Sequence, residues 1–339
     1  MEKVILAMSG GVDSSVSAFL LKQQGYEVIG ATFCWNKNSS ICVKDSNKVC
    51  EKLGIEHIIF EYKNEFQTEI VDKFNKYIKN GLIPNPCVWC NQIIKFGKMF
   101  EICKQQGAKF STGHYVKLKD NRIYRAKDLL KDQSYFLCNI KREILGDLIF
   151  PLGDYLKSEI FRIAEKNNLL ELENYKESQG VCFFKDQTYT EYFKNLNIEE
   201  KKGDIIHIET KKKLGEHNGL LKYAIGQRKG FGVSYSEPLY VIEKDFSNNI
   251  LYVGEKGKLY TNEINIKDLI FLVEEFENKN TFECKVCLRD KSELIDAEII
   301  KQDNNKAKVV LKKQVYKVSK GQWCVFYIDN MLIGGGEII

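Results

Sequence analysis

The sequence predicts an α/β fold in which an N-terminal, doubly wound parallel sheet precedes a small central domain and a C-terminal antiparallel β-barrel. In the first half of the chain, short apolar runs alternate with glycine-ended amphipathic helices, which is typical of a parallel sheet. Polar loops and lysine pairs dominate after about residue 186, and short alternating segments follow from about residue 250. We expect domains at residues 1–186, 187–248 and 249–339.

The N-terminal elements follow one another at a regular pitch. Residues 3–8, KVILAM, are an apolar run that predicts a buried strand, and the following helix ends at Gly25. The next elements are predicted at residues 27–33 (strand), 43–54 (helix), 57–62 (strand), 64–80 (helix), 90–107 (helix), 108–115 (strand), 115–126 (hairpin turning at Asp120 and Asn121) and 157–169 (helix).

Composition describes an ordinary globular protein of two or three domains. The chain has 339 residues, of which 44% are hydrophobic and 29% charged. Its N-terminal apolar run is too short for a signal peptide or a membrane span, so we expect a cytoplasmic protein without a membrane partner. The eleven cysteines should then be mostly reduced. A net charge of +5 permits a polyanionic partner without requiring one.

The stretch SGGVDSS, residues 9–15, lies between a predicted strand and a predicted helix. Glycines let the backbone approach an anion, and a helix N-terminus favours negative charge. It lacks both the Lys-Ser/Thr ending of a Walker A loop and the Gly-x-Gly-x-x-Gly of dinucleotide folds. It resembles the pyrophosphatase loop of the Rossmann-like N-type ATP pyrophosphatases, which implies cleavage of ATP to AMP and pyrophosphate, with Mg²⁺ at Asp13. The expected nucleotide-binding residues are Ala7, Met8, Ser9, Gly10, Gly11, Val12, Asp13 and Ser14.

Cysteines are the second chemical feature of the chain. Cys87 and Cys90 form a Cys-x-x-Cys in PNPCVWCN, and Cys182 follows a glycine and precedes two aromatic residues. The pair alone is compatible with a redox dithiol, half of a metal site, or a nucleophile with a helper. Because Cys90 begins the predicted helix 90–107, we expect the helix N-terminus to lower its pKa and favour the thiolate.

Several blocks together resemble the bacterial tRNA-specific 2-thiouridylase family. They occur in order from residue 4 to about residue 328, nearly the whole chain: NPCVWCNQIIKFG, STGHY, KDQSYFL, FPLGDYLKSEI, SQGVCFF, GEHNGLLKYAIGQRKGFG and GQWCVFY. The resemblance implies that ATP adenylates O2 of the wobble uridine of tRNA and that a persulfide on Cys182 attacks C2. Cys90 is then the second catalytic cysteine, either as an attacking partner or by forming a disulfide with Cys182.

The resemblance also implies binding residues. Phe33 and Gly113 match positions that contact the nucleotide, and Asn85 and Pro86 match positions that face the target base. Arg228 and Lys229, in a basic turn flanked by glycines, are expected phosphate contacts on the basis of their charge. The full set expected to contact tRNA is Asn85, Pro86, Cys87, His114, Asp132, Gln133, Ser134, Arg228, Lys229 and Gln322.

Cys87 departs from the family pattern, which has aspartate there. Three thiols, Cys87, Cys90 and Cys182, are a ligand set that can hold a [4Fe–4S] cluster with one iron open to sulfide. The sequence therefore leaves two routes open, a persulfide carried by Cys182 or sulfide bound to a cluster. Zinc is less apt because a fourth protein ligand is not evident.

Two other functions share part of these features. An ATP-dependent amide-forming ligase needs the SGGVDSS loop but neither Cys90 nor Cys182. A non-catalytic iron–sulfur or redox protein that binds RNA needs no pyrophosphatase loop. If the thiolation hypothesis holds, the partners are tRNA and a sulfur-donating relay protein or cysteine desulfurase, and a monomer is the simplest expectation.

Overall fold

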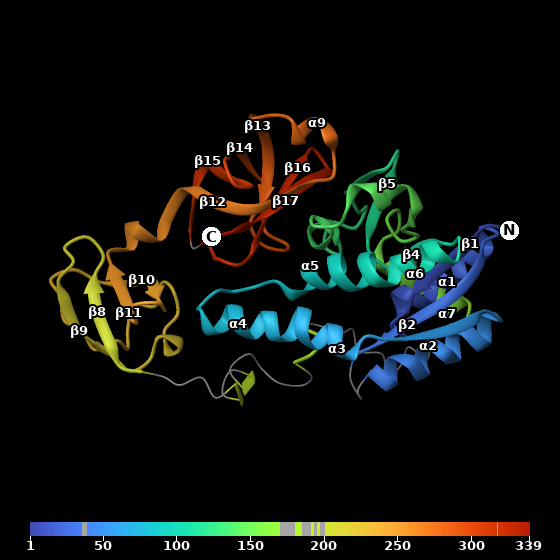
Figure 1. Ribbon diagram of the computed structural model, residues 1–339, viewed down its shortest axis with the longest axis horizontal. Helices are drawn as coiled ribbons and strands as arrows, with labels where there is room; N and C mark the ends of the chain where they lie inside the picture. Colours follow the sequence, from blue (N-terminus) through green and yellow to red (C-terminus); the bar gives the residue numbers. More distant parts are fainter. Residues whose placement is uncertain (36–38, 170–179, 185–190, 193–194, 197–200, 317) are drawn as a thin grey trace.

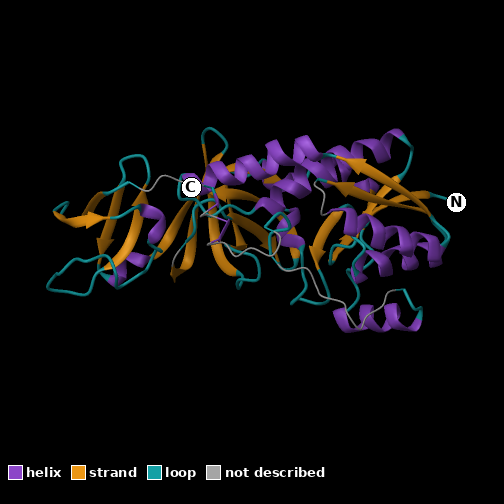
Figure 2. Cartoon of the chain, turned by 90° about the horizontal axis from the view of Figure 1, so that it is seen from below, coloured by secondary structure: helices purple, strands orange, loops and turns teal. Residues whose placement is uncertain are grey.

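The computed structural model of the chain describes residues 1–35, 39–169, 180–184, 191–192, 195–196, 201–316 and 318–339. Its three parts lie side by side along one long axis (Figure 1). The N-terminal α/β part is at one end, the barrel in the middle and the central sheet at the other end. The view turned by 90° shows the same order (Figure 2).

A five-stranded parallel sheet forms the N-terminal part, as predicted. Its order is β3-β2-β1-β4-β7. Alternate side chains of the central strand β1 point to opposite faces, so Val4 and Leu6 pack in one core cluster and Ile5 in another. The strands are β1 (Lys3–Ala7), β2 (Glu27–Cys34), β3 (Glu56–Glu61), β4 (Lys109–Thr112) and β7 (Leu148–Ile149).

Helices cover both faces of this sheet. One group packs against Val4, Leu6 and Val28, and comprises α1 (Val12–Gln23) and α2 (Ser39–Leu53), with α7 (Lys157–Lys166) beside α1. The second group packs on Ile5, Ile29 and Phe110. It comprises α3 (Lys63–Phe66), the π-helical segment η1 (Gln67–Asp72), α4 (Lys73–Lys79), α5 (Pro86–Cys90), the π-helical segment η2 (Asn91–Met99) and α6 (Phe100–Gln105).

The predicted helix 90–107 begins earlier than the sequence analysis placed it. Asn85 is the N-cap, and its side-chain oxygen accepts a hydrogen bond from the Cys87 backbone N–H at 3.2 Å. Pro86 takes the first helical position, where a missing N–H costs nothing. The expectation that Cys90 heads the helix was therefore wrong, because Cys87 lies in the first turn and Cys90 ends α5.

The predicted hairpin at 115–126 is confirmed and connects the two larger parts. β5 (Val116–Lys119) and β6 (Arg122–Arg125) are joined at Asp120 and Asn121, which both have positive φ. β6 also pairs with the barrel strand β17, through Tyr124 opposite Met331. A short 3₁₀ helix, η3 (Ser134–Leu137), follows this hairpin and packs against the barrel, and a second, η4 (Arg142–Asp147), precedes β7.

The central part is a four-stranded sheet of order β10-β11-β8-β9. Strand β11 follows residue 248 yet pairs with both β10 and β8, so this sheet continues past the limit expected from the sequence. A 3₁₀ turn, η6 (Leu220–Lys222), lies between β9 and β10. The strands are β8 (Gly203–His207), β9 (Lys213–His217), β10 (Tyr240–Asp245) and β11 (Ile250–Gly254).

The C-terminal part is a closed antiparallel barrel of six strands, which confirms the predicted fold class. Closure comes from pairing of the first barrel strand with the last, β12 with β17. A short 3₁₀ turn, η7 (Lys256–Leu259), leads into the barrel, and α9 (Glu274–Glu277) follows β12. The strands are β12 (Tyr260–Phe271), β13 (Thr281–Cys287), β14 (Ile295–Gln302), β15 (Lys306–Tyr316), β16 (Trp323–Ile328) and β17 (Met331–Ile338).

Polar contacts attach the barrel to the N-terminal part. The Tyr77 hydroxyl on α4 donates to the buried carboxylate of Glu337 on β17 at 2.9 Å. The backbone N–H of Ile83 donates to the Lys320 carbonyl at 2.9 Å.

Across the described ranges of the chain, no helix is long and apolar enough to cross a bilayer.

Candidate active site

The loop between β1 and α1 lies at the carboxyl end of the parallel sheet, where open α/β sheets bind ligands. Gly10 has a φ of 76°, and a Cβ there would lie 2.5 Å from the Asp45 Cβ, so the loop requires glycine. Gly113, beyond the end of β4, lies against the same loop, because a Cβ on it would be 3.2 Å from the Ser14 backbone nitrogen. Two segments predicted to bind the nucleotide therefore meet in the structure.

Hydroxyl groups hold the start of α1. Ser14 and Ser15 donate to the Gly11 carbonyl at 3.0 and 2.9 Å, and the Ser9 N–H donates to the Ser14 hydroxyl at 3.3 Å. These bonds fix the loop as a tight turn into a helix. The arrangement agrees with an anion site at a helix N-terminus.

The side chain of Asp13 is engaged by two other residues. The Lys157 ammonium lies 2.7 Å from each of its carboxylate oxygens, and the Tyr115 hydroxyl donates to Oδ1 at 2.6 Å. Lys157 is nearly buried, with 10% of its side chain exposed. From the sequence, Asp13 was expected to bind Mg²⁺, and no local pattern pointed to Lys157 or Tyr115 as its partners.

The three predicted thiols line one cavity of about 630 Å³ at the carboxyl ends of β1 and β2. Met8, Ser9 and Phe33, all predicted to bind the nucleotide, line the same cavity. Its remaining walls come from the second helix group, the segment around Cys182 and a barrel loop. Besides these, the lining includes Thr32, Trp35, Cys42, Phe66, Ile70, Pro86, Asn91, Lys95, His114, Lys131, Asp132, Gln133, Phe136, Gly180, Val181, Phe183, Asp290 and Lys291.

Two aromatic residues that follow Cys182 attach its segment to the helices. The ring of Phe183 lies 5.3 Å from that of Phe74, and the ring of Phe184 lies 5.5 Å from the same ring. Edge-to-face contacts of this kind add to the burial of large apolar area. The aromatic pair thus holds Cys182, which is 92 residues from Cys90 in the sequence, at the cavity.

All three thiols are held in the neutral form. Burial raises the pKa of Cys90 to about 11. Cys182 is an exposed residue, but its thiol faces the cavity, where partial desolvation, followed by the charges of Cys90 and Cys87, raises its pKa to about 12. Burial also raises the pKa of Cys87, and the charge of Asp290 adds to the effect. The expectation of a Cys90 thiolate at a helix N-terminus was therefore wrong, because burial outweighs the helix and Cys90 is not in its first turn.

Lys95 opposes this effect, and the sequence analysis missed it. Its charge lowers the pKa of each of the three thiols. In an α-helix, residues five apart point in different directions. The segment η2 is π-helical, with i→i+5 bonding, and Lys95 lines the same cavity as Cys90. If the segment is assumed to be an α-helix, the sequence does not indicate that a lysine five residues after Cys90 lies near the thiols.

His114 faces the cavity as a neutral imidazole. Its Nδ1 lies 2.6 Å from the Thr112 hydroxyl, and its ring is packed against Phe96. Burial, with the charge of Lys95 as a second cause, holds its pKa well below the ordinary value. His114 can therefore exchange hydrogen bonds with a ligand at neutral pH but carries no charge.

The residues expected to contact tRNA fall into three groups. Pro86, Cys87, His114, Asp132 and Gln133 line the cavity. Asn85 caps α5 beside it, while the Ser134 and Gln322 side chains are buried and bonded inside the protein, Ser134 to Asp132 and Gln322 to the Ile83 carbonyl. Arg228 and Lys229 are exposed in the central part and do not line the cavity.

The cysteines do not form a ready metal site. Among the residues that the structure describes, no three His, Cys, Asp or Glu side chains are grouped closely enough to hold a metal ion. All eleven cysteines, each within the described ranges, are free thiols. The arrangement brings Cys87, Cys90 and Cys182 to one cavity.

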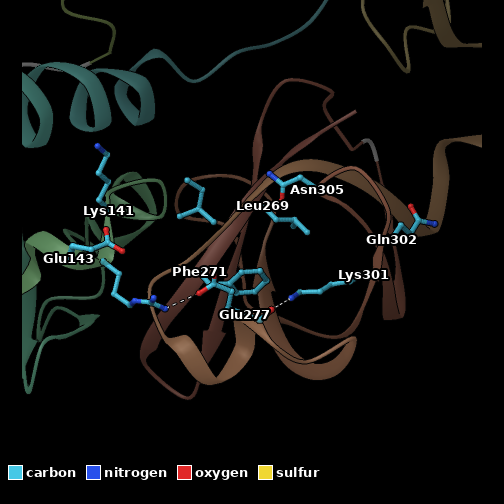
Figure 3. Close-up of a pocket in the computed structure, with 10 residues that line it drawn as sticks. Lys141, Glu143, Leu269, Phe271, Glu277, Lys301, Gln302 and Asn305 are labelled. Carbon is cyan, nitrogen blue, oxygen red and sulfur yellow. Dashed lines mark hydrogen bonds and ion pairs between the residues drawn. The ribbon is translucent and has the colours of Figure 1, made fainter.

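A second cavity of about 470 Å³ lies between η4 and the barrel (Figure 3). Three of its charged side chains are engaged within the protein, since Arg142 pairs with Glu277 at 3.0 Å and the Lys301 ammonium lies 4.5 Å above the Phe271 ring. It contains neither a cysteine nor any residue of the predicted site. The predicted site residues therefore gather at the larger cavity and not at this one.

Models of three domain families match successive parts of the chain. The tRNA methyl transferase HUP domain matches residues 2–186, the tRNA methyl transferase PRC-barrel domain residues 191–255, and the aminomethyltransferase beta-barrel domain residues 261–338. The first model alone covers more than half of the chain.

Curated relatives align along the full length. A tRNA-specific 2-thiouridylase MnmA of Hydrogenobaculum sp. (strain Y04AAS1) is 42% identical over 347 residues, covering 99% of each chain. The protein of the same name from Rickettsia typhi is 39% identical, covering 100% of this chain and 99% of its own. That from Aquifex aeolicus is 37% identical, covering 99% and 98%.

Likeness to solved structures is weaker. A 4-thiouridine synthetase–RNA complex with bound ATP is 18% identical with a TM-score of 0.37, covering 57% of this chain and 49% of that chain. NMN synthetase from Francisella tularensis is 15% identical with a TM-score of 0.33, covering 50% and 63%. Scores this low support no conclusion about activity.

Proposed function

The chain belongs to the tRNA-specific 2-thiouridylase family, and we propose that it uses ATP to replace O2 of the wobble uridine of tRNA with sulfur. One observation carries the proposal. Cys90 and Cys182, with Cys87, line a cavity that also reaches the loop predicted to bind ATP, through Ser9. A thiol that delivers sulfur and a nucleotide that activates the same base must act at one place.

The first step is adenylation of the base. The loop Ala7–Ser14 binds ATP, with Phe33 and Gly113 beside the nucleotide. Uridine O2 attacks the α-phosphorus, a new O–P bond forms, and pyrophosphate leaves as the bond to the β-phosphate breaks. This step converts O2 into a good leaving group, because AMP leaves far more easily than oxide. Support comes from the glycine-dependent turn into α1 and the close approach of Gly113 to Ser14.

The second step is transfer of sulfur. A relay protein or a cysteine desulfurase loads a terminal sulfur onto Cys182, giving a persulfide. That sulfur attacks C2 and AMP leaves with O2. The Cys90 thiol, having lost its proton, attacks the Sγ of Cys182. The bond between this Sγ and the sulfur attached to C2 then breaks, which leaves 2-thiouridine and a Cys90–Cys182 disulfide. A thiol reductant must then restore both cysteines. In a variant of this route, Cys90 acts as the attacking partner instead of releasing the sulfur by disulfide formation.

The cluster route uses the same three cysteines. When bound, an iron–sulfur cluster supplies an open iron that activates sulfide. As described, the three thiols share a cavity but are not grouped as metal ligands. No step is assigned to a cluster, and the iron content of the purified protein is the measurement that separates the two routes.

Magnesium at Asp13 fits poorly for a different reason. Mg²⁺ supplies charge that bridges and neutralises the phosphates of ATP. Both carboxylate oxygens of Asp13 are occupied by the Lys157 ammonium, and Oδ1 also accepts from Tyr115. No step is assigned to a metal on Asp13.

The remaining assignments follow from the position of each residue. Asn85, Pro86, Cys87, His114, Asp132 and Gln133 surround the target base, and Arg228 and Lys229 contact tRNA phosphates from the exposed loop of the central part. Ser134 and Gln322, which are buried, act by holding the cavity wall and the barrel. We propose domain limits of 1–186, 187–254 and 255–339, the second limit following the end of β11.

The test is mass spectrometry of tRNA from a deletion strain. We expect 2-thiouridine to be missing from the wobble position and restored by the wild-type chain. Intact thiolation in the deletion strain would refute the proposal. Iron and sulfide measured on anaerobically purified protein separate the sulfur routes: full activity without iron supports the persulfide, and about four irons per chain required for activity supports the cluster. An amide-forming ligase would leave tRNA unchanged and would tolerate loss of Cys90 and Cys182.

A further inference from the structure

Asn91 has a buried side-chain oxygen that no group of the protein uses. The residue follows Cys90 directly in the chain, is 2% exposed, and lines the same cavity as that thiol. Its Nδ2 donates to the Phe136 carbonyl at 3.2 Å. Its Oδ1 is buried and accepts no hydrogen bond from any residue that the structure describes. Because most buried polar side-chain atoms are bonded, an open acceptor in the wall of a cavity points to a donor on the ligand.

The contact with Phe136 fixes the orientation of the Asn91 amide. Turning the amide over would set Oδ1 against the Phe136 carbonyl oxygen, and neither atom can donate. Phe136 lies in η3, the 3₁₀ helix that follows the cavity residue Gln133. A backbone carbonyl of η3 therefore holds the donor end of the amide, which leaves the acceptor end for a ligand.

Asn91 belongs to the helix face that carries two of the thiols. Four residues at the i, i+1, i+4 and i+5 spacing of one helical face line the cavity: Pro86, Cys87, Cys90 and Asn91. The residues predicted to bind the nucleotide come from other elements, the loop after β1 and the end of β2. The open acceptor thus lies in the wall predicted to face the target base.

The chemistry of the pyrimidines decides which base suits this acceptor. Uridine has one ring N–H, at N3, between the carbonyl groups at C2 and C4. Cytidine has an unprotonated N3, which is itself an acceptor, so an oxygen at this place bonds uridine and repels cytidine. When O2 attacks the α-phosphorus, positive charge spreads onto N3–H, and a hydrogen bond from N3–H becomes stronger in the transition state.

We infer that Asn91 is a specificity-determining residue of this enzyme, whose Oδ1 accepts a hydrogen bond from N3–H of the target uridine. This role rests on the proposed thiolation of uridine and adds to it the group that selects the base. Phe136 is a positioning residue, because its carbonyl holds the amide. Since C2 is bonded to N3, the same contact holds the reacting carbon on the side of the cavity that carries Cys90.

The test compares two tRNAs that differ only at the wobble position, which carries uridine in one and 3-methyluridine, without the N3 proton, in the other. The readout is kcat/KM for ATP-dependent pyrophosphate release by the full chain. We expect wild type to prefer uridine about ten- to a hundredfold, the range for loss of a hydrogen bond to a buried acceptor. In Asn91→Ala the preference should fall below about threefold, because the acceptor is gone and the methyl group has room. Each preference is a ratio within one preparation, so a misfolded fraction cancels.

Two further variants complete the test. Gln92→Ala is the matched control, because the Gln92 Oε1 accepts from Asn139 at 2.8 Å and does not line the cavity; it should keep the wild-type preference. Asn91→Asp keeps an acceptor of the same size and should keep most of the preference.

Three results would overturn the inference. The first is a wild-type enzyme that uses 3-methyluridine as well as uridine. The second is an unchanged preference in Asn91→Ala with both rates lowered equally, as a purely structural residue would give. The third is a raised Kd of ATP for Asn91→Ala without tRNA, which would place the acceptor at the adenine amine. Wild-type protein that releases no pyrophosphate with the uridine tRNA would instead refute the proposed function, and the role of Asn91 with it.

Discussion

The protonated state of the cavity thiols leads to a quantitative prediction. Only the thiolate reacts with iodoacetamide. With a pKa of about 11, Cys90 is about one part in a thousand thiolate at pH 8, whereas an ordinary cysteine of pKa about 8.5 is about one quarter thiolate. Alkylation of Cys90 at pH 8 should therefore be about two hundredfold slower than that of a free thiol. Because the folded pKa is raised, the rate should climb about tenfold per pH unit up to about pH 11.

Lys95 provides the perturbation. Its charge lowers the pKa of the cavity thiols, so Lys95→Met should raise them further. As a general scale, two unit charges that lie about 10 Å apart at an effective dielectric constant of 20 interact by about 1.7 kcal/mol, which corresponds to slightly more than one pKa unit. We expect alkylation at a fixed pH below 11 to fall by about tenfold or slightly more in this variant, and Lys95→Arg to restore it.

The assay is alkylation over pH 7–11 with mass spectrometry of the peptide that carries Cys90, in a Cys87→Ser background so that one thiol is counted. Lys98→Met is the matched control, because Lys98 lies in the same π-helical segment but pairs with Glu65 at 3.8 Å and does not line the cavity. Fast alkylation at pH 7 would refute the burial argument. Equal rates in the Lys95→Met and Lys98→Met variants would refute the role of Lys95.

Three further predictions test the site and its support. Cys90→Ser and Cys182→Ser should each abolish tRNA thiolation by the purified enzyme while pyrophosphate release continues; thiolation at the wild-type rate in either variant would contradict the mechanism. Gly113→Ala should weaken ATP binding about tenfold, because the new Cβ lies 3.2 Å from the Ser14 nitrogen and pushes the loop. Gly257→Ala, where a Cβ has nothing within 4 Å, should leave ATP binding unchanged. Calorimetry compares the two variants, and equal affinities for ATP would show that the loop tolerates the methyl group. Tyr77→Phe should lower the free energy of unfolding by about 1–3 kcal/mol, because the buried Glu337 carboxylate loses its hydroxyl donor. Urea unfolding measures this change, with Tyr260→Phe at an exposed position as the control. An unchanged unfolding midpoint would mean that this contact does not hold the barrel in place.

Much of the N-terminal fold could be predicted because its signals are local. A buried strand, a glycine turn and a glycine-ended helix are encoded within about 25 consecutive residues, and the structure has each of them where the pattern indicated. The start of the helix at Pro86 could also be predicted from the sequence, since asparagine followed by proline is a typical N-cap and first helical position. A helix that begins at Pro86 places Cys87, and not Cys90, in its first turn, which removes the basis for a Cys90 thiolate.

The sequence by itself determined the chemistry on offer: a loop suited to phosphate, and the three cysteines Cys87, Cys90 and Cys182. Only the tertiary structure decided how these groups meet. Aromatic packing of Phe183 and Phe184 carries Cys182 to the cavity, π-helical winding turns Lys95 toward the thiols, and packing of α7 against α1 delivers Lys157 to Asp13. Burial then raises the thiol pKa values, because the desolvation of a thiolate depends on every wall of the cavity, and no local stretch of sequence contains those walls.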